Sequence, residues 1–154
     1  MGMMSAPNSI YLEIGGSGFI YSLNYDRNLG NIIAVRAGFG YLPLPTQTTA
    51  SGAKVTASLT SVPVSISWFP FSSSTSSPSS KLEIGAGASY EELVAKKIAK
   101  SKVGSGIAYT GILGYRYQPA DGGFLFRIAF TPFLSSPIFT GFEPWGGITL
   151  GYGF

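Results

Sequence analysis

The sequence predicts an all-β fold in which eight antiparallel strands close into an up-and-down barrel. Apolar residues alternate with small or polar residues at a period of two in eight separate segments, which is the pattern of strands with two different faces. The chain is 45% hydrophobic, yet it contains no run of the roughly 18 apolar residues that a membrane-spanning helix needs. Only 11% of the residues are charged, which is few for the surface of a soluble domain.

The first two alternating segments, SIYLEIG (9–15) and FIYSLNYDR (19–27), flank the glycine-rich sequence GGSG (15–18). The bulky residues occupy even positions in the first segment and odd positions in the second. A straight strand cannot change faces in this way, so GGSG is predicted to form a tight hairpin turn. A bulge within one long strand is the alternative.

The same alternation continues to the end of the chain. One face of each later segment carries Phe, Tyr, Trp, Ile, Leu or Val, and the other carries mainly Gly, Ser, Ala and Thr. These six segments are NIIAVRAGFGYL (31–42), VPVSISWF (62–69), KLEIGAGASY (81–90), IAYTGILGYRYQ (107–118), FLFRIAFT (124–131) and PWGGITLGYGF (144–154).

The composition of the two faces predicts which one lies outside. A face of Gly, Ser, Ala and Thr with isolated charges suits the narrow interior of an eight-stranded barrel. The bulky apolar face suits contact with lipid, and closure leaves no open sheet edge in hydrocarbon. We therefore expect a transmembrane β-barrel. A soluble, lipocalin-like barrel that binds an apolar ligand is an alternative.

The connections between these segments differ in length. Residues 1–8 are expected to form an N-terminal tail and residues 9–154 a single barrel domain. Three connections are short or of low complexity, at 28–31, 72–80 and 119–123, and alternate with mostly longer expected loops at 42–54, 91–105 and 133–144.

The last strand carries the most specific motif. Aromatic or apolar residues occupy every second position up to the terminal residue, at Ile148, Leu150, Tyr152 and Phe154, and GYRYQPADGGFLFRIAFTP (114–132) reads as two strands joined by a short turn. In these features the chain resembles the small eight-stranded outer-membrane barrel proteins of Gram-negative bacteria. The resemblance implies a lipid bilayer as partner, and a C-terminal signal (Leu150, Tyr152, Phe154) that the outer-membrane assembly machinery reads. The first residues lack the features of a signal peptide, so we expect a mature, monomeric form.

Charged residues on the less apolar face form the first candidate site. Glu13, Arg36, Glu83, Arg116 and Arg127 occupy such positions, and an unpaired buried charge is very costly. We expect these side chains to form a network that closes the lumen as a structural plug. A gate, or a binding site for a small polar solute, is the functional alternative.

Lysines in one short segment form the second candidate site. Lys96, Lys97, Lys100 and Lys102 could hold phosphates of lipopolysaccharide or another anionic partner, or could belong to a solvated loop. They are too localised, at a net charge of +3, to indicate nucleic-acid binding. The apolar segment 133–144 is expected to lie at the lipid interface, fold over the barrel mouth or contact a partner.

Enzymatic activity is not expected. The chain has no histidine and no cysteine, which excludes Ser–His and Cys–His catalysis and removes the commonest general base. No metal-ligand pattern is present, and we expect no cofactor. The predicted function is a structural or surface-interaction role, with a narrow channel or a transporter of hydrophobic or other small solutes as the alternative.

Overall fold

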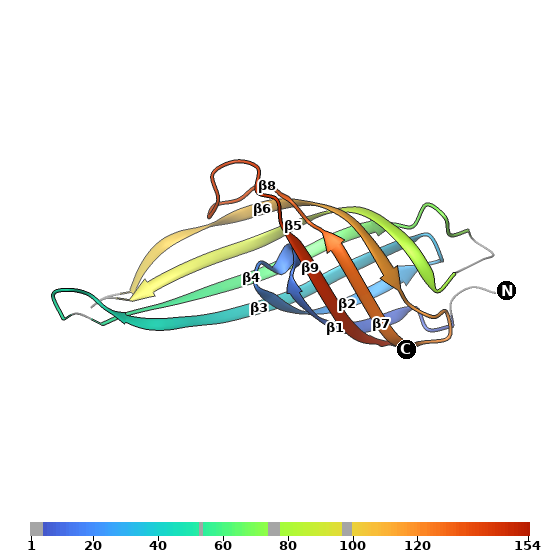
Figure 1. Cartoon of the computed structure of the whole chain (residues 1–154), viewed down its shortest axis with the longest axis horizontal. Coiled ribbons are helices and arrows are strands. Elements are labelled where there is room, and N and C mark those ends of the chain that lie inside the picture. The colour runs from blue at the N-terminus through green and yellow to red at the C-terminus, as the bar shows by residue number, and fades with distance from the viewer. Residues whose placement is uncertain (1–4, 53, 74–77, 97–99) are drawn as a thin grey trace.

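The protein forms a closed barrel of eight antiparallel strands, as the sequence predicted (Figure 1). The computed structural model describes residues 5–52, 54–73, 78–96 and 100–154. Within these residues, no helix has both the length and the apolar character needed to cross a membrane. The barrel strands are β1 (Asn8–Gly15), β2 (Tyr21–Leu29), β3 (Ile33–Thr48), β4 (Lys54–Trp68), β5 (Ser80–Lys96), β6 (Lys100–Tyr117), β7 (Gly123–Phe130) and β9 (Gly146–Gly153).

Each barrel strand pairs with the next one along the chain, and β1 pairs with β9 to close the sheet. Two short elements complete the fold, the 3-10 turn η1 (Gly16–Gly18) and β8 (Phe133–Ser135). β8 pairs with Tyr109 and Thr110 of β6 and so follows β7 along the same neighbour. Because closure leaves no unpaired edge around the barrel wall, all eight strands have partners on both sides there.

A tight hairpin joins β1 to β2, as expected from the change of alternation at GGSG. Ile14 pairs with Tyr21 across the turn, and η1 lies between the two strands. Gly15 and Gly16 adopt positive φ angles of 77° and 66°, which glycine reaches without a steric penalty. The alternative of a single bulged strand is therefore wrong.

The two faces of the strands have opposite environments. In β1, Ile10, Leu12 and Ile14 are exposed on the outside, whereas Tyr11 and Glu13 are buried inside. The same alternation holds in β2, β7 and β9. The exposed bulky side chains thus form a continuous apolar band around the barrel.

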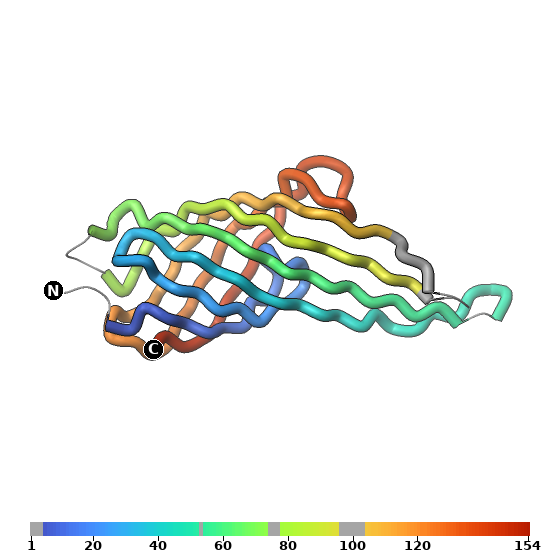
Figure 2. The backbone as a smooth tube through the Cα atoms, turned by 180° about the vertical axis from the view of Figure 1, so that it is seen from behind, coloured from blue at the N-terminus to red at the C-terminus, as the bar shows by residue number. Residues whose placement is uncertain are grey.

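Strands β3 to β6 are about twice as long as the others and continue past the barrel as a four-stranded sheet (Figures 1 and 2). We call this part the extension. The pairing of β2 with β3 ends at Phe39, whereas β3 stays paired with β4 up to Thr48. The end of β3 that includes Pro43 and Pro45 is therefore an edge of the extension.

The extension corrects the expected loops at 42–54 and 91–105, because most of both segments is strand. Beyond the barrel wall neither face of a strand has to be apolar, so the alternation fades although the backbone pairing continues.

Both termini lie at the end of the barrel opposite the extension (Figure 2). The amide of Asn8 donates to the carbonyl of Phe154 at 3.0 Å, and the amide of Phe154 donates back to Asn8 at 2.8 Å. The short connections lie at this same end, so the chain enters and leaves the barrel on one side.

Candidate functional site: the charged barrel interior

The strands bring every charged residue of the predicted interior set to the inside of the barrel. Glu13 lies on β1, Arg36 on β3, Glu83 on β5, Arg116 on β6 and Arg127 on β7, and all five are buried. Each occupies an inward position of its strand because its neighbours in sequence are the outward bulky residues.

A central cluster joins four strands across the barrel. Arg36 Nη1 lies 2.6 Å from Glu13 Oε2, and Arg127 Nη1 lies 3.0 Å from the same oxygen. Arg127 Nε lies 2.6 Å from Glu83 Oε2, so one guanidinium bridges two carboxylates. The Thr149 hydroxyl of β9 also donates to Glu13 Oε2, at 3.4 Å.

A second cluster lies nearer the termini. Arg116 binds Asp26 in a bidentate manner, with Nη1–Oδ2 and Nη2–Oδ1 distances of 2.9 and 2.8 Å. Its Nε donates to Gln118 Oε1 at 3.0 Å, and Nη2 donates to Ser9 at 3.3 Å. Its guanidinium also lies 5.6 Å from the centre of the Phe69 ring. Two parallel bonds fix the guanidinium plane as well as its position.

Two charged residues of this interior were absent from the predicted set. Asp26 is the partner of Arg116, and Lys81 lies buried with its Nζ atom 5.1 Å from the centre of the Phe69 ring. Both occupy inward positions by the same alternation that placed Glu83 and Arg127 inside. That alternation was the available signal, although the pairing itself joins residues far apart in sequence.

The arrangement is suited to holding strands together across the lumen rather than to chemistry. Each of the four printed ion pairs joins side chains that are almost completely buried, where removal of one partner is costly. Arg36 Nη2, Arg127 Nη2 and Tyr11 Oη have no hydrogen-bond partner in the described chain. The described residues include no group of side chains that could hold a metal ion.

The segment after β7 folds over the barrel mouth. Phe133 is fully buried and packs against Phe19, with ring centres 6.0 Å apart. The hydroxyl of Ser136 donates to Oε2 of the buried Glu91 at 3.0 Å. Of the three expectations for residues 133–144, closure over the mouth therefore describes Phe133 and Ser136, while Phe142 is exposed.

The other predicted site residues lie at the two ends of the molecule. Leu150, Tyr152 and Phe154 point outward and are exposed next to the N-terminal strand. At the tip of the extension, the backbones of Lys96 and Lys100 are paired, and Lys102 is opposite Val94. Lys97 lies outside the described residues.

Comparison with solved structures identifies the fold. The N-terminal β-barrel domain of OprF from Pseudomonas aeruginosa superposes with a TM-score of 0.59 at 12% identity, over 100% of both chains. Ail, the attachment invasion locus protein of Yersinia pestis, in complex with the heparin analogue sucrose octasulfate, gives 0.55 at 14% identity, over 99% of this chain and 98% of Ail. The chain has the fold of the small bacterial outer-membrane β-barrels. Another structure of Ail gives 0.50 at 12% identity, over 95% of this barrel and 91% of Ail. No protein-family model and no curated protein sequence matches the chain.

Proposed function

We propose that this barrel is an integral protein of the bacterial outer membrane that binds an anionic partner through its extension and performs no enzymatic reaction. The observation that carries the proposal is the continuation of β3 to β6 as a sheet well beyond the other four strands (Figure 1). A barrel that only filled a membrane would not need strands of 15 to 18 residues on one side, because about 9–11 residues span the bilayer.

The orientation follows from the two ends of the barrel. Outer-membrane barrels have short turns on the periplasmic side and long loops outside the cell. The termini and the short connections share one end here, and the extension projects from the other. In this orientation the extension stands on the cell surface, and Phe154 lies on the side where the assembly machinery acts.

The tip of the extension suggests the chemistry of the partner. Four lysines fall within residues 96–102 of the sequence, and clustered lysines attract phosphate and sulfate groups. Ail has been crystallised with a sulfated heparin analogue, which supports testing the same chemistry on this barrel. The phosphates of lipopolysaccharide are the partner that we expect.

The test is binding of the protein, refolded in neutral vesicles, to immobilised lipopolysaccharide. Replacing Lys96, Lys97, Lys100 and Lys102 by glutamine together should abolish binding, and raised salt should weaken it in the unchanged protein. Single Lys100→Gln and Lys54→Gln variants form a matched pair, since each lysine borders a different hairpin tip of the extension. Binding that survives the fourfold replacement, or that Lys54→Gln weakens as much as Lys100→Gln, would overturn the proposal.

We further propose that the charged interior closes the lumen. The bridge from Arg127 to both Glu13 and Glu83 supports closure. The unpartnered Nη2 atoms of Arg36 and Arg127 favour the alternative, a narrow channel whose polar solute would accept these donors. Ion flux into vesicles distinguishes the two, with a gel shift between boiled and unboiled samples showing insertion. Inserted but silent barrels are expected, and flux that changes on Glu13→Gln or Glu83→Gln would favour the channel.

A further inference from the structure

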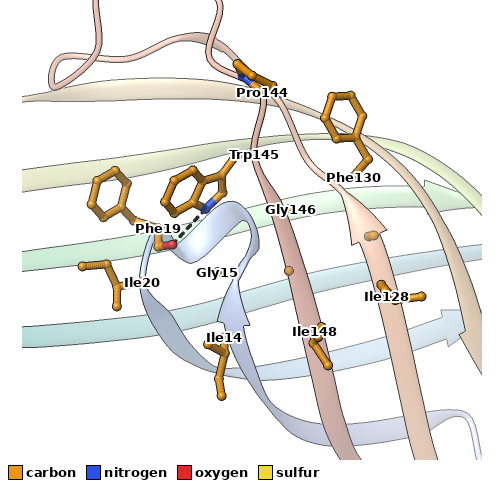
Figure 3. Close-up of a pocket in the computed structure, with 12 residues that line it drawn as sticks. Ile14, Gly15, Phe19, Ile20, Ile128, Phe130, Pro144, Trp145, Gly146 and Ile148 are labelled. Carbon is orange, nitrogen blue, oxygen red and sulfur yellow. Dashed lines mark hydrogen bonds between the residues drawn. The ribbon is translucent and has the colours of Figure 1, made fainter.

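The outer surface of the barrel carries an apolar groove near the end from which the extension projects (Figure 3). It has a volume of about 1050 Å³ and lies where the β1–β2 hairpin meets the upper ends of β7 and β9. Its floor is formed by Ile14, Ile128 and Ile148, and its upper wall by Phe19 and Trp145. This volume is comparable to that of small-molecule binding sites in proteins.

Small residues create the groove. The outward positions of β9 carry Ile148, Leu150 and Tyr152, and the same alternation places Gly146 next in line on that face. A side chain at this position would stand in the groove, which Gly146 lines. The missing side chain therefore leaves a depression within the otherwise bulky outer band.

The upper wall is held in place by hydrogen bonding and ring packing. Trp145 Nε1 donates to the carbonyl of Phe19 at 3.0 Å, and the two rings stack with centres 5.7 Å apart and planes 14° apart. Phe19 has a φ of 75°, a conformation that non-glycine residues adopt at a cost. Phe133 and Phe139 pack behind this pair. The groove is thus preformed, because its wall is fixed without a ligand.

The lining determines what the groove can hold. None of the 12 residues that line it is charged. The indole N–H of Trp145 is already bound to Phe19, so a polar occupant would gain no side-chain donor there. The floor residues Ile14, Ile128 and Ile148 are themselves 63%, 48% and 50% exposed and belong to the apolar band. The groove is continuous with the surface that faces hydrocarbon when the barrel is inserted.

We propose that this groove binds one acyl chain of a bilayer lipid, in the leaflet nearer the extension. Tryptophan prefers the boundary between hydrocarbon and headgroups, so Trp145 would lie near the headgroup end of the chain and the three isoleucines along its length. The proposal rests on the membrane insertion proposed above. A partner protein or a second barrel copy is the competing occupant, but nothing in the lining offers such a partner a polar contact.

The two tryptophans of the chain allow a direct test. Trp145 lines the groove, whereas Trp68 ends β4 near the opposite end of the barrel and is exposed. The Trp68→Phe protein reports on Trp145 alone, and Trp145→Phe reports on Trp68 alone. Each is refolded into phosphatidylcholine vesicles that contain an increasing fraction of lipid with brominated acyl chains, which quench tryptophan fluorescence on contact.

A matched pair of glycine variants separates groove binding from general lipid contact. In the Trp68→Phe background, Gly146→Phe places a ring in the groove. Gly111→Phe places the same ring on the outward face of β6, where the nearest non-neighbouring heavy atom would lie 3.7 Å from the added Cβ. We expect stronger quenching of Trp145 than of Trp68 at low fractions of brominated lipid. Gly146→Phe should remove this excess, and Gly111→Phe should preserve it.

Three results would contradict the proposal, provided that the unboiled sample migrates as a folded, inserted barrel. These are equal quenching of Trp145 and Trp68, equal effects of the two glycine variants, and quenching that disappears as the protein-to-lipid ratio rises, which would indicate that a second copy covers the groove. Ile148→Phe is the second filling variant, because a Cβ at Gly146 would lie only 3.1 Å from the carbonyl of Ala129 and could impair folding. Failure of the unchanged protein to insert would contradict the proposed function instead.

Discussion

Replacing Arg127 by leucine tests the interior network most directly. Arg127 is fully buried and contacts both Glu13 and Glu83, at 3.0 and 2.6 Å. In the variant, Glu13 keeps the guanidinium of Arg36 at 2.6 Å. Glu83 loses the guanidinium that faces its carboxylate and remains in the closed interior.

The expected cost follows from the burial of the pair. Removing one partner of a buried ion pair destabilises a protein by about 3–5 kcal/mol, because the remaining charge is left without compensation. The equilibrium between folded and unfolded protein should therefore shift by roughly two to three orders of magnitude. A second replacement, Glu83→Leu, should recover part of this loss, since it removes the stranded charge.

The measurement is urea unfolding of the vesicle-inserted barrel, followed by tryptophan fluorescence and by the gel shift on boiling. Arg27→Leu is the matched control, because Arg27 is exposed and its contact is a 3.5 Å hydrogen bond to Asn8. It should change the free energy of unfolding by no more than about 0.5 kcal/mol. If Arg127→Leu unfolds at the same urea concentration as Arg27→Leu, the interior charges do not stabilise the fold in the way argued here.

Two further predictions concern the chain terminus and the first hairpin. Deleting Phe154 should slow assembly in cells while leaving the urea stability of the refolded barrel nearly unchanged; an equal loss in both assays would make Phe154 a packing residue instead of a signal. Gly16→Ala should destabilise the barrel more than Gly30→Ala in the same urea assay. Both glycines have φ near 66°, but an added Cβ would overlap the Glu13 carboxylate at Gly16 and meet nothing within 4 Å at Gly30. Equal losses would mean that the contact with Glu13 does not contribute.

The barrel wall could be predicted from the sequence because its physical constraint repeats at every second residue. Bulky residues must face outward and small or charged residues inward, so Glu13 and Arg127 could be placed before any pairing was known. The pairing of Arg116 with Asp26 could not, because strand order around a closed barrel brings together residues 90 positions apart. Alternation places a side chain on a face but does not say which inward residue lies opposite.

The extension and the groove depend on interactions that leave weaker patterns. Residues 42–48 contain prolines and threonines and read as a loop, yet backbone pairing with β4 makes them a strand. The groove requires the stacking of Phe19 on Trp145, which joins residues 126 positions apart through a turn of unusual geometry. Neither feature has a period that sequence analysis could detect.

The prolines on the β3 edge have a consequence for how neighbouring copies behave. Where two barrels lie side by side in one membrane plane, the free edges of their extensions can meet, and a free edge offers backbone donors and acceptors to a second sheet. Proline has no amide hydrogen, and within a paired strand it is tolerated where its nitrogen faces away from the partner. Pro43 and Pro45 have the same parity in β3, so both remove donors from the open side. Growth of a shared sheet across two copies is thereby hindered at this edge, and each molecule keeps its extension to itself.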